Sequence, residues 1–337
     1  MSSALGSQPC SAPGCGKTGD LICGSCRSVN YCSAACQRAQ WRGHKEECNT
    51  TAAVRFQEGI VGAEAGDRNK QFFVGTCYDL GSGVPKNAAS AFEWYMRAAN
   101  QGHPGGQHNV AIALERGDGV PVDDAQAVIW FHRAAAGGYS GSQLKLGFRY
   151  SSGAGIARND IRAVAFFRSA ALGGDVTAQY ELGKHLFGGV GTPADSAEAS
   201  VWLLKSAGAG NRNAQYLLGC IFDKGLGGCV DAAQAKQWYE AAAKSGHAEA
   251  MYHLGLLYKN GRGVAHDAAA AATWYRRGAE AGSSGAKCNL GACLMAGDGV
   301  PIDKAEGLLW CRRAAQAGDA VAMAYLSRQG LGFASQA

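Results

Sequence analysis

Apolar and small residues recur along this chain with a strict period of 36 residues from about residue 66 onward. An aromatic residue occupies the same place in each period. The seven aromatic positions are Trp94, Trp130, Phe166, Trp202, Trp238, Trp274 and Trp310. Glycine keeps the same period from Gly66 to Gly318. A repeat of this length indicates a solenoid, in which each unit packs on its neighbours.

Each period contains two helical patterns separated by a glycine loop. In the first pattern, residues such as Ala250, Leu254 and Tyr258 recur at helical spacing. A Gly-x-Gly-Val loop follows, as in 261–264, and then a second, alanine-rich segment. An Asn or Asp precedes the second segment in every unit, where its side chain can cap the helix. These residues are Asn87, Asp123, Asn159, Asp195, Asp231, Asp267 and Asp303. The pattern predicts an all-α fold of about seven two-helix repeats.

The repeat pattern also predicts the domain boundaries. Residues 51–66 keep the period but carry Glu58 in place of the aromatic residue, so we expect a linking or capping helix there. Residues 67–329 form the expected solenoid, and residues 330–337 should fray. A separate segment, residues 10–48, holds more than half of the cysteines.

Composition favours an intracellular protein. The first nine residues have neither the basic start nor the apolar run of a secretory signal. No stretch reaches the roughly 18 apolar residues of a membrane span. Seven of the 13 cysteines are clustered, and six are scattered: Cys77, Cys220, Cys229, Cys288, Cys293 and Cys311. We expect free thiols in a reducing compartment, in the cytoplasm and/or the nucleus.

The clustered cysteines have the spacing of metal ligands. The eight potential ligands are Cys10, Cys15, Cys23, Cys26, Cys32, Cys36, His44 and Cys48. Eight sulfur and nitrogen ligands make two tetrahedral sets, so we expect two structural zinc ions with no open position for water. An iron–sulfur cluster suits the histidine and the paired spacing less well. Once seven thiolates and two zinc ions are counted, the formal charge falls from +5 to +2, which gives little support to nucleic-acid binding.

This segment resembles a MYND zinc finger in the run from Cys23-Gly-Ser-Cys26 through Tyr31-Cys32 to Trp41, His44 and Cys48. The resemblance implies a cross-brace with two ligand sets. One set is Cys10, Cys15, Cys32 and Cys36, and the other is Cys23, Cys26, His44 and Cys48. It also implies docking of proline-containing peptides by Gln37 and Trp41, although Trp41 could instead fill the module's small core. The first cysteine pair departs from the family in having four intervening residues instead of two.

The repeated segment is similar to the Sel-1-like repeat, a relative of the tetratricopeptide repeat. The motifs Ala178-Gln-Tyr-Glu-Leu-Gly183, Gly261-Arg-Gly-Val264 and Trp274-Tyr275 carry this resemblance. It implies a right-handed superhelix with a concave surface. The 36-residue period and the glycine loop distinguish it from the 34-residue tetratricopeptide repeat.

One position of the first helix varies chemically from unit to unit while its neighbours repeat. We name it the variable position; its residues are Asn109, Lys145, Glu181, Leu217, His253 and Asn289. We expect it to face solvent, either lining a binding groove or forming an unused wet surface. A ladder of glutamines invites a binding interpretation too, but structural packing is favoured. The ladder is Gln71, Gln107, Gln143, Gln179 and Gln215.

These features predict a non-enzymatic adaptor in which the zinc module and the solenoid each bind protein segments. The chain contains no phosphate loop, nucleophile elbow or paired-carboxylate motif. A nuclear transcriptional or chromatin co-regulator is the alternative, because MYND modules also accompany such proteins. The repeats occupy the space that a methyltransferase domain would need. The sequence does not indicate the partner, the oligomeric state or the face of the solenoid that binds.

Overall fold

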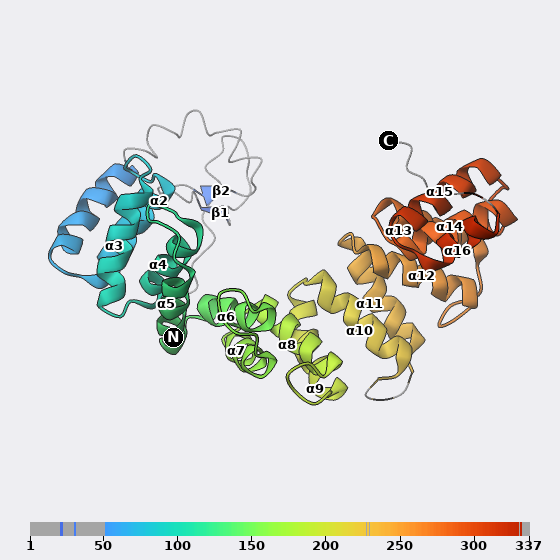
Figure 1. The fold of residues 1–337 in the computed structure, drawn as a ribbon, viewed down its shortest axis with the longest axis horizontal. Coiled ribbons are helices and arrows are strands. Elements are labelled where there is room, and N and C mark those ends of the chain that lie inside the picture. Colours follow the sequence, from blue (N-terminus) through green and yellow to red (C-terminus); the bar gives the residue numbers. More distant parts are fainter. Residues whose placement is uncertain are drawn as a thin grey trace. The chain divides into compact units, whose positions relative to one another are not determined.

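A computed structural model gives the fold (Figure 1). It describes residues 21–22, 30–31, 51–226, 228, 230–329 and 331. The chain divides into two compact units, residues 1–158 and 159–337, and each is described by itself. Within the described part of the chain, no helix is long and apolar enough to cross a membrane.

The first unit contains a short hairpin and a stack of helices. Strand β1 (Leu21–Ile22) pairs antiparallel with β2 (Asn30–Tyr31). Residues 51–64 are helical, and five further helices follow. They are α2 (Arg68–Leu80), α3 (Ala88–Asn100), α4 (Pro104–Arg116), α5 (Asp124–Ala136) and α6 (Ser140–Ser152).

The second unit continues the same alternation. Its helices are α7 (Asp160–Leu172), α8 (Val176–Gly188), α9 (Ser196–Gly208), α10 (Arg212–Lys224), α11 (Ala232–Lys244), α12 (Ala248–Asn260), α13 (Ala268–Glu280), α14 (Ser284–Ala296), α15 (Lys304–Gln316) and α16 (Ala320–Arg328). Even-numbered helices are the first helices of the repeats and odd-numbered ones the second helices. Within each unit, a helix packs mainly on its neighbours in sequence, and first helices also touch the next first helix, as α12 touches α14. The predicted two-helix repeats are confirmed.

The predicted caps of the second helices are confirmed in all seven repeats. In each, the Asn or Asp side-chain oxygen accepts a hydrogen bond from the backbone N–H three residues later. Asp303, for example, accepts from Glu306 at 2.8 Å. The seven bonds are made by Asn87, Asp123, Asn159, Asp195, Asp231, Asp267 and Asp303. Each bond satisfies a backbone donor that the helix itself leaves free.

The core of each repeat lies one residue beyond the tryptophan ladder. Trp94, Trp130, Trp202 and Trp310 are buried and the other three aromatics of the ladder are half-buried, but the residue after the aromatic is buried more deeply. Tyr275 is fully buried, and its ring lies against Gly255 of the first helix. A Cβ atom on Gly255 would come within 2.4 Å of that ring, so the glycine makes room for it.

In most of the described loops the second glycine is needed for a close approach to the backbone of the preceding repeat. Gly299 has φ +73°, and a Cβ there would lie 2.1 Å from the Ala268 carbonyl oxygen, at the start of α13 in the preceding repeat. Gly119 meets Ala88 in the same way, at 2.3 Å. Only glycine tolerates both the left-handed backbone and this contact.

Candidate interaction sites

The predicted zinc ligands and the peptide-docking pair Gln37 and Trp41 lie outside the described residues. The hairpin is the part of this module that the structure describes. It pairs Ile22 with Asn30 and Leu21 with Tyr31. In the sequence, Cys23 follows Ile22 directly and Cys32 follows Tyr31. These two cysteines belong to different predicted zinc sets, so each strand of the hairpin directly precedes a ligand of a different set.

The variable position does not face open solvent. Glu181 is only 8% exposed, and the other five residues at this position are half-buried. The prediction of a solvent-facing position is therefore wrong for Glu181, and it overstates the exposure of Asn109, Lys145, His253 and Asn289. Lys145 and His253 meet Glu115 and Tyr216 of the preceding first helix, and Glu181 pairs with Lys184 of its own helix.

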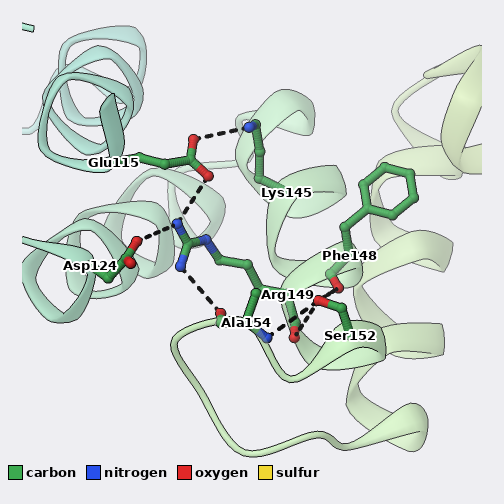
Figure 2. A network of polar contacts seen from close by, with 7 residues as sticks. All are labelled: Glu115, Asp124, Lys145, Phe148, Arg149, Ser152 and Ala154. Atoms are coloured by element: carbon green, nitrogen blue, oxygen red, sulfur yellow. Dashed lines mark hydrogen bonds and ion pairs between the residues drawn. The ribbon is translucent and has the colours of Figure 1, made fainter. Parts of the chain in front are cut away.

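Lys145 shows this contact most clearly (Figure 2). Its ammonium group lies 3.0 Å from a carboxylate oxygen of Glu115, near the end of α4. The other Glu115 oxygen lies 2.9 Å from the Arg149 guanidinium, which is also 3.0 Å from Asp124 at the start of α5. The lysine and arginine lower the pKa of Glu115, although burial opposes them. Lys145 thus helps to join two repeats.

Arg149 completes this network from a position that is apolar in most repeats. The residues 36, 72 or 108 positions away include Ala113, Ile221 and Leu257, all buried. The Arg149 side chain is 7% exposed, and it also donates to the Ala154 carbonyl in its own glycine loop at 3.2 Å. Among the residues that the structure describes, its Nε has no hydrogen-bond partner. Neither Arg149 nor Glu115 was predicted from the sequence, although an arginine at a position that is apolar in most repeats was a usable signal.

The variable position of α12 is set in an aromatic environment. The Nε2 atom of His253 lies 3.4 Å from the Tyr216 hydroxyl, and its ring stacks on Tyr239 with centroids 5.1 Å apart. Burial lowers the pKa of His253. The Tyr239 hydroxyl donates to the Cys220 sulfur at 3.6 Å. These contacts hold the imidazole between α10, α11 and α12.

The glutamine ladder has a structural role, as favoured from the sequence. Each glutamine donates from Nε2 to a backbone carbonyl eight residues earlier, at the end of the preceding second helix. The Gln215 bond to Ala207, for example, is 3.2 Å long. The five bonds come from Gln71, Gln107, Gln143, Gln179 and Gln215. Each of these carbonyls also accepts the backbone N–H of a glycine three residues later, so the ladder gives a second hydrogen bond to a carbonyl at the helix end.

The strongest histidine perturbation also has a structural explanation. Burial lowers the pKa of His108 to about 4, with a smaller contribution from Lys145. Its Nδ1 lies 2.8 Å from the Ser142 hydroxyl, but Ser142 is fully buried and its oxygen cannot meet a substrate. The thiols of Cys77, Cys220, Cys293 and Cys311 are buried, and burial raises the pKa of each. Buried, protonated thiols of this kind are unreactive.

Two family models match this chain. The MYND finger matches residues 10–48. The Sel1 repeat matches seven times, over residues 71–103, 104–139, 140–175, 176–211, 212–247, 248–283 and 284–319. The chain belongs to the Sel1 repeat family. The MYND finger implies zinc binding, and the two kinds of module together indicate a protein–protein interaction role.

Solved structures of Sel1 repeat proteins share this fold. A protective antigen of uropathogenic Escherichia coli strains that displays an SLR fold is 27% identical, with a TM-score of 0.67, over 91% of this chain and 78% of the antigen. A Sel1 repeat protein from Oxalobacter formigenes is 31% identical, with a TM-score of 0.63, over 83% of this chain and 81% of that protein.

Curated relatives match over short segments. Ubiquitin carboxyl-terminal hydrolase 17 of Arabidopsis thaliana is 39% identical over 71 residues, which are 20% of this chain and 10% of the hydrolase. Ubiquitin carboxyl-terminal hydrolase 19 of the same plant is 54% identical over 35 residues, 10% of this chain and 5% of that protein. The Sel1 repeat chain therefore spans at most a tenth of the length of these relatives.

Proposed function

We propose that this protein is a non-enzymatic adaptor that holds two protein segments at once. Its zinc module docks a proline-containing peptide, and the first helices of its repeats bind a second segment. The observation that supports this best is the presence of two different interaction modules, a MYND finger and seven Sel1 repeats, in one chain.

In this proposal the module holds two structural zinc ions. Cys10, Cys15, Cys32 and Cys36 bind one ion, and Cys23, Cys26, His44 and Cys48 bind the other. Cysteine thiolates and histidine nitrogen are the donors that tetrahedral zinc prefers, and four protein ligands leave no place for a reactive water. The zinc ions would supply folding free energy to a segment with little apolar content.

The peptide would bind beside the metals. Gln37 and Trp41 are four residues apart and would share one face of a helix. The indole of Trp41 offers a flat apolar platform to a proline-rich strand, and the Gln37 amide can bond to its backbone. On the repeats, Asn109 and Lys145 would form the wall of a binding face in the first unit, and Glu181, His253 and Asn289 would do so in the second unit.

A peptide-binding experiment tests the zinc-module half of the proposal. An array of proline-containing peptides is probed with the full chain, with Trp41→Ala and with Gln37→Ala. Gln57→Ala is the matched control, because Gln57 is an exposed glutamine on the helix after the module. Zinc content is measured for every variant, so that a loss of metal is not mistaken for a loss of contacts.

We expect the first two variants to lose peptide binding at least tenfold with unchanged zinc, and Gln57→Ala to bind as the parent does. Equal binding by all four proteins would contradict the docking role. A chain limited to residues 51–337 should lose these peptides and still recover the partners of the repeats.

A further inference from the structure

Helix 51–64 makes the contacts of a second helix. Its residues 52–64 lie 36 positions before α3, and the loop after α2 approaches it as later loops approach later second helices. A Cβ on Gly83 would lie 2.3 Å from the Ala52 carbonyl oxygen. Gln71 donates to the Ala63 carbonyl at 3.1 Å, which is the bond of the glutamine ladder. The helix is therefore the second half of a repeat whose first half lies outside the described residues.

The outer face of α2 carries apolar side chains at positions that are mostly polar or small in later first helices. Phe73 is 37% exposed and Leu80 is 71% exposed. Phe73 stands at the variable position, which is polar or charged in most later repeats. The residues at the position of Leu80 are Arg116, Ser152, Gly188, Lys224, Asn260 and Ala296. The end unit of a solenoid needs a polar outer face, so the two apolar side chains indicate that another element covers α2.

A groove of about 590 Å³ lies between helix 51–64 and α2. Ala52, Arg55 and Glu58 of helix 51–64 line it, together with Phe73 and Leu80 of α2. This volume is in the range of clefts that bury most of a drug-sized molecule, so the groove can receive several side chains.

In later repeats a preceding first helix packs where this groove lies. Lys145 of α6 pairs with Glu115 of α4 at 3.0 Å, and the Tyr325 hydroxyl of α16 lies 3.1 Å from the Met295 sulfur of α14. Each pair joins a residue in the register of the variable position to one 30 positions earlier. Thirty positions before the variable residue of α2 stands Gly43, within the zinc module. The repeat register therefore assigns the place of the preceding first helix to that module.

The zinc module is joined to the groove by a very short tether. Its last predicted ligand is Cys48, and helix 51–64 begins at Thr51. Three Cα–Cα steps span at most about 11 Å. Ala52 and Arg55 of the groove lie in the first two turns of the same helix. An occupant on so short a tether has an effective concentration on the order of millimolar, which a separate protein or a second copy of the chain would have to exceed.

We propose that the zinc module packs into this groove through residues 32–48 and takes the place of the first helix of that repeat. Residues 32–44 lie 36 positions before α2, where the repeat register puts such a helix. The docked module covers Phe73 and Leu80 and caps the array. It also presents the proposed peptide site at a fixed place beside the first repeats, which a module on a free tether would not do.

A photo-crosslinker in the groove tests the packing. Phe73→p-benzoylphenylalanine is made in the full, zinc-loaded chain, and mass spectrometry locates the products. We expect crosslinks within one chain to residues 32–48. The same substitution at Phe148 of α6, a phenylalanine of similar exposure at 40%, is the matched control and should give no crosslink to that segment.

Hydrogen exchange shows whether docking protects the end of the array. We expect chelation of zinc to speed amide exchange in residues 51–64 and 68–80 about tenfold and to leave α5 and α6 unchanged. Leu80→Asp should speed the same amides with zinc still bound, because the groove would desolvate the carboxylate. Chelation of Leu80→Asp should then add less than twofold, since the module has already left the groove.

Leu172→Asp is the matched control for the exchange experiment. Leu172 is also the last residue of a helix and is 73% exposed, so a carboxylate there has the same cost at a helix end. This variant should exchange as the parent does in residues 51–80. Equal exchange in Leu80→Asp and Leu172→Asp would overturn the proposal.

The crosslinks separate the module from other occupants. Crosslinks between two chains at position 73 would make the groove an interface between copies, and the assignment to the zinc module would be wrong. If chelation speeds exchange in residues 51–64 but position 73 gives no crosslink to residues 32–48, the module acts only through its tether and the proposal fails. Neither failure touches the proposed binding of peptides by Trp41 and Gln37, which the peptide array tests separately.

Discussion

Arg149 places a positive charge where other repeats bury an apolar side chain. Its guanidinium is held by Glu115, Asp124 and the Ala154 carbonyl, so its charge is compensated within the unit. Removing one partner of such a group leaves the others desolvated without compensation, which costs more than the net interaction is worth. The residue therefore makes this end of the first unit sensitive to substitution.

We predict that Arg149→Ala destabilises the protein by about 2 kcal/mol, less than the 3–5 kcal/mol typical of a fully buried pair, because Asp124 and Glu115 are partly exposed. Urea unfolding followed by circular dichroism measures the change. A triple variant, Arg149→Leu with Glu115→Gln and Asp124→Ala, copies the apolar repeats and should recover most of the loss. A free energy of unfolding within 0.5 kcal/mol of the parent for Arg149→Ala, roughly the level of a surface change, would refute the argument.

Two histidine caps give the fold a dependence on pH. The Nδ1 atoms of His103 and His247 accept the backbone N–H of Gly106 and Ala250, at 3.0 and 3.2 Å. A protonated Nδ1 cannot accept this bond, and burial lowers the pKa of both residues. Their contribution is present above the unfolded pKa of about 6.5 and is lost as pH falls through the lower folded value.

We therefore expect the double variant His103→Asn and His247→Asn to lose less thermal stability between pH 7.5 and 5.5 than the parent does. Asparagine is a strong cap and does not titrate in this range. Because zinc release at low pH affects both proteins alike, the difference between their melting temperatures isolates the two caps. Parallel pH profiles would show that the caps do not titrate in this window.

At the scale of helices, contacts local in sequence were predictable and contacts between repeats were not. The capping role of Asp303 and its equivalents follows from a residue type at a helix start. The pair Glu115–Lys145 does not, because its members are 30 residues apart and a comparison at a period of 36 never places them together. The same comparison identified Trp274 as one of the repeating aromatic positions, and could not show that the next residue, Tyr275, lies deeper.

The zinc and peptide residues stay predictions, since they lie outside the described part of the structure. Of the proposed wall residues, His253 and Lys145 were singled out from the sequence, but the residues that surround them were not predicted.

The close contact between a glycine of the first helix and a ring of the second helix predicts how a substitution at that glycine changes stability. Gly255→Ala should destabilise the protein by about 1–3 kcal/mol, because the new methyl group would overpack against Tyr275. This outweighs the gain of up to about 1 kcal/mol in helix propensity. Gly208→Ala in α9 is the matched control, since a Cβ there meets nothing within 4 Å, and it should be neutral or slightly stabilising. Thermal unfolding gives the melting temperatures of both variants, and similar shifts in the two melting temperatures would contradict the packing argument.

At the scale of the whole chain, the repeats and the zinc module rest on different sources of stability. Within each unit the helices pack on their sequence neighbours, so the repeats are held by short-range apolar contacts. A cysteine-rich finger is held by its metal. Zinc removal should therefore act on one part of the chain and leave the other folded.

We predict that the purified protein contains two zinc ions per chain by atomic emission spectroscopy. A strong chelator at neutral pH should remove both and abolish proline-peptide binding, while the helical signal at 222 nm changes little, since the 15 helices α2 to α16 lie outside the finger. Replacing Cys32 with serine should weaken one zinc set and report whether the two sets unfold together, as interleaved ligands require. Collapse of the helical signal on chelation would mean that the repeats depend on the finger, and a content of one zinc would refute the two-set assignment.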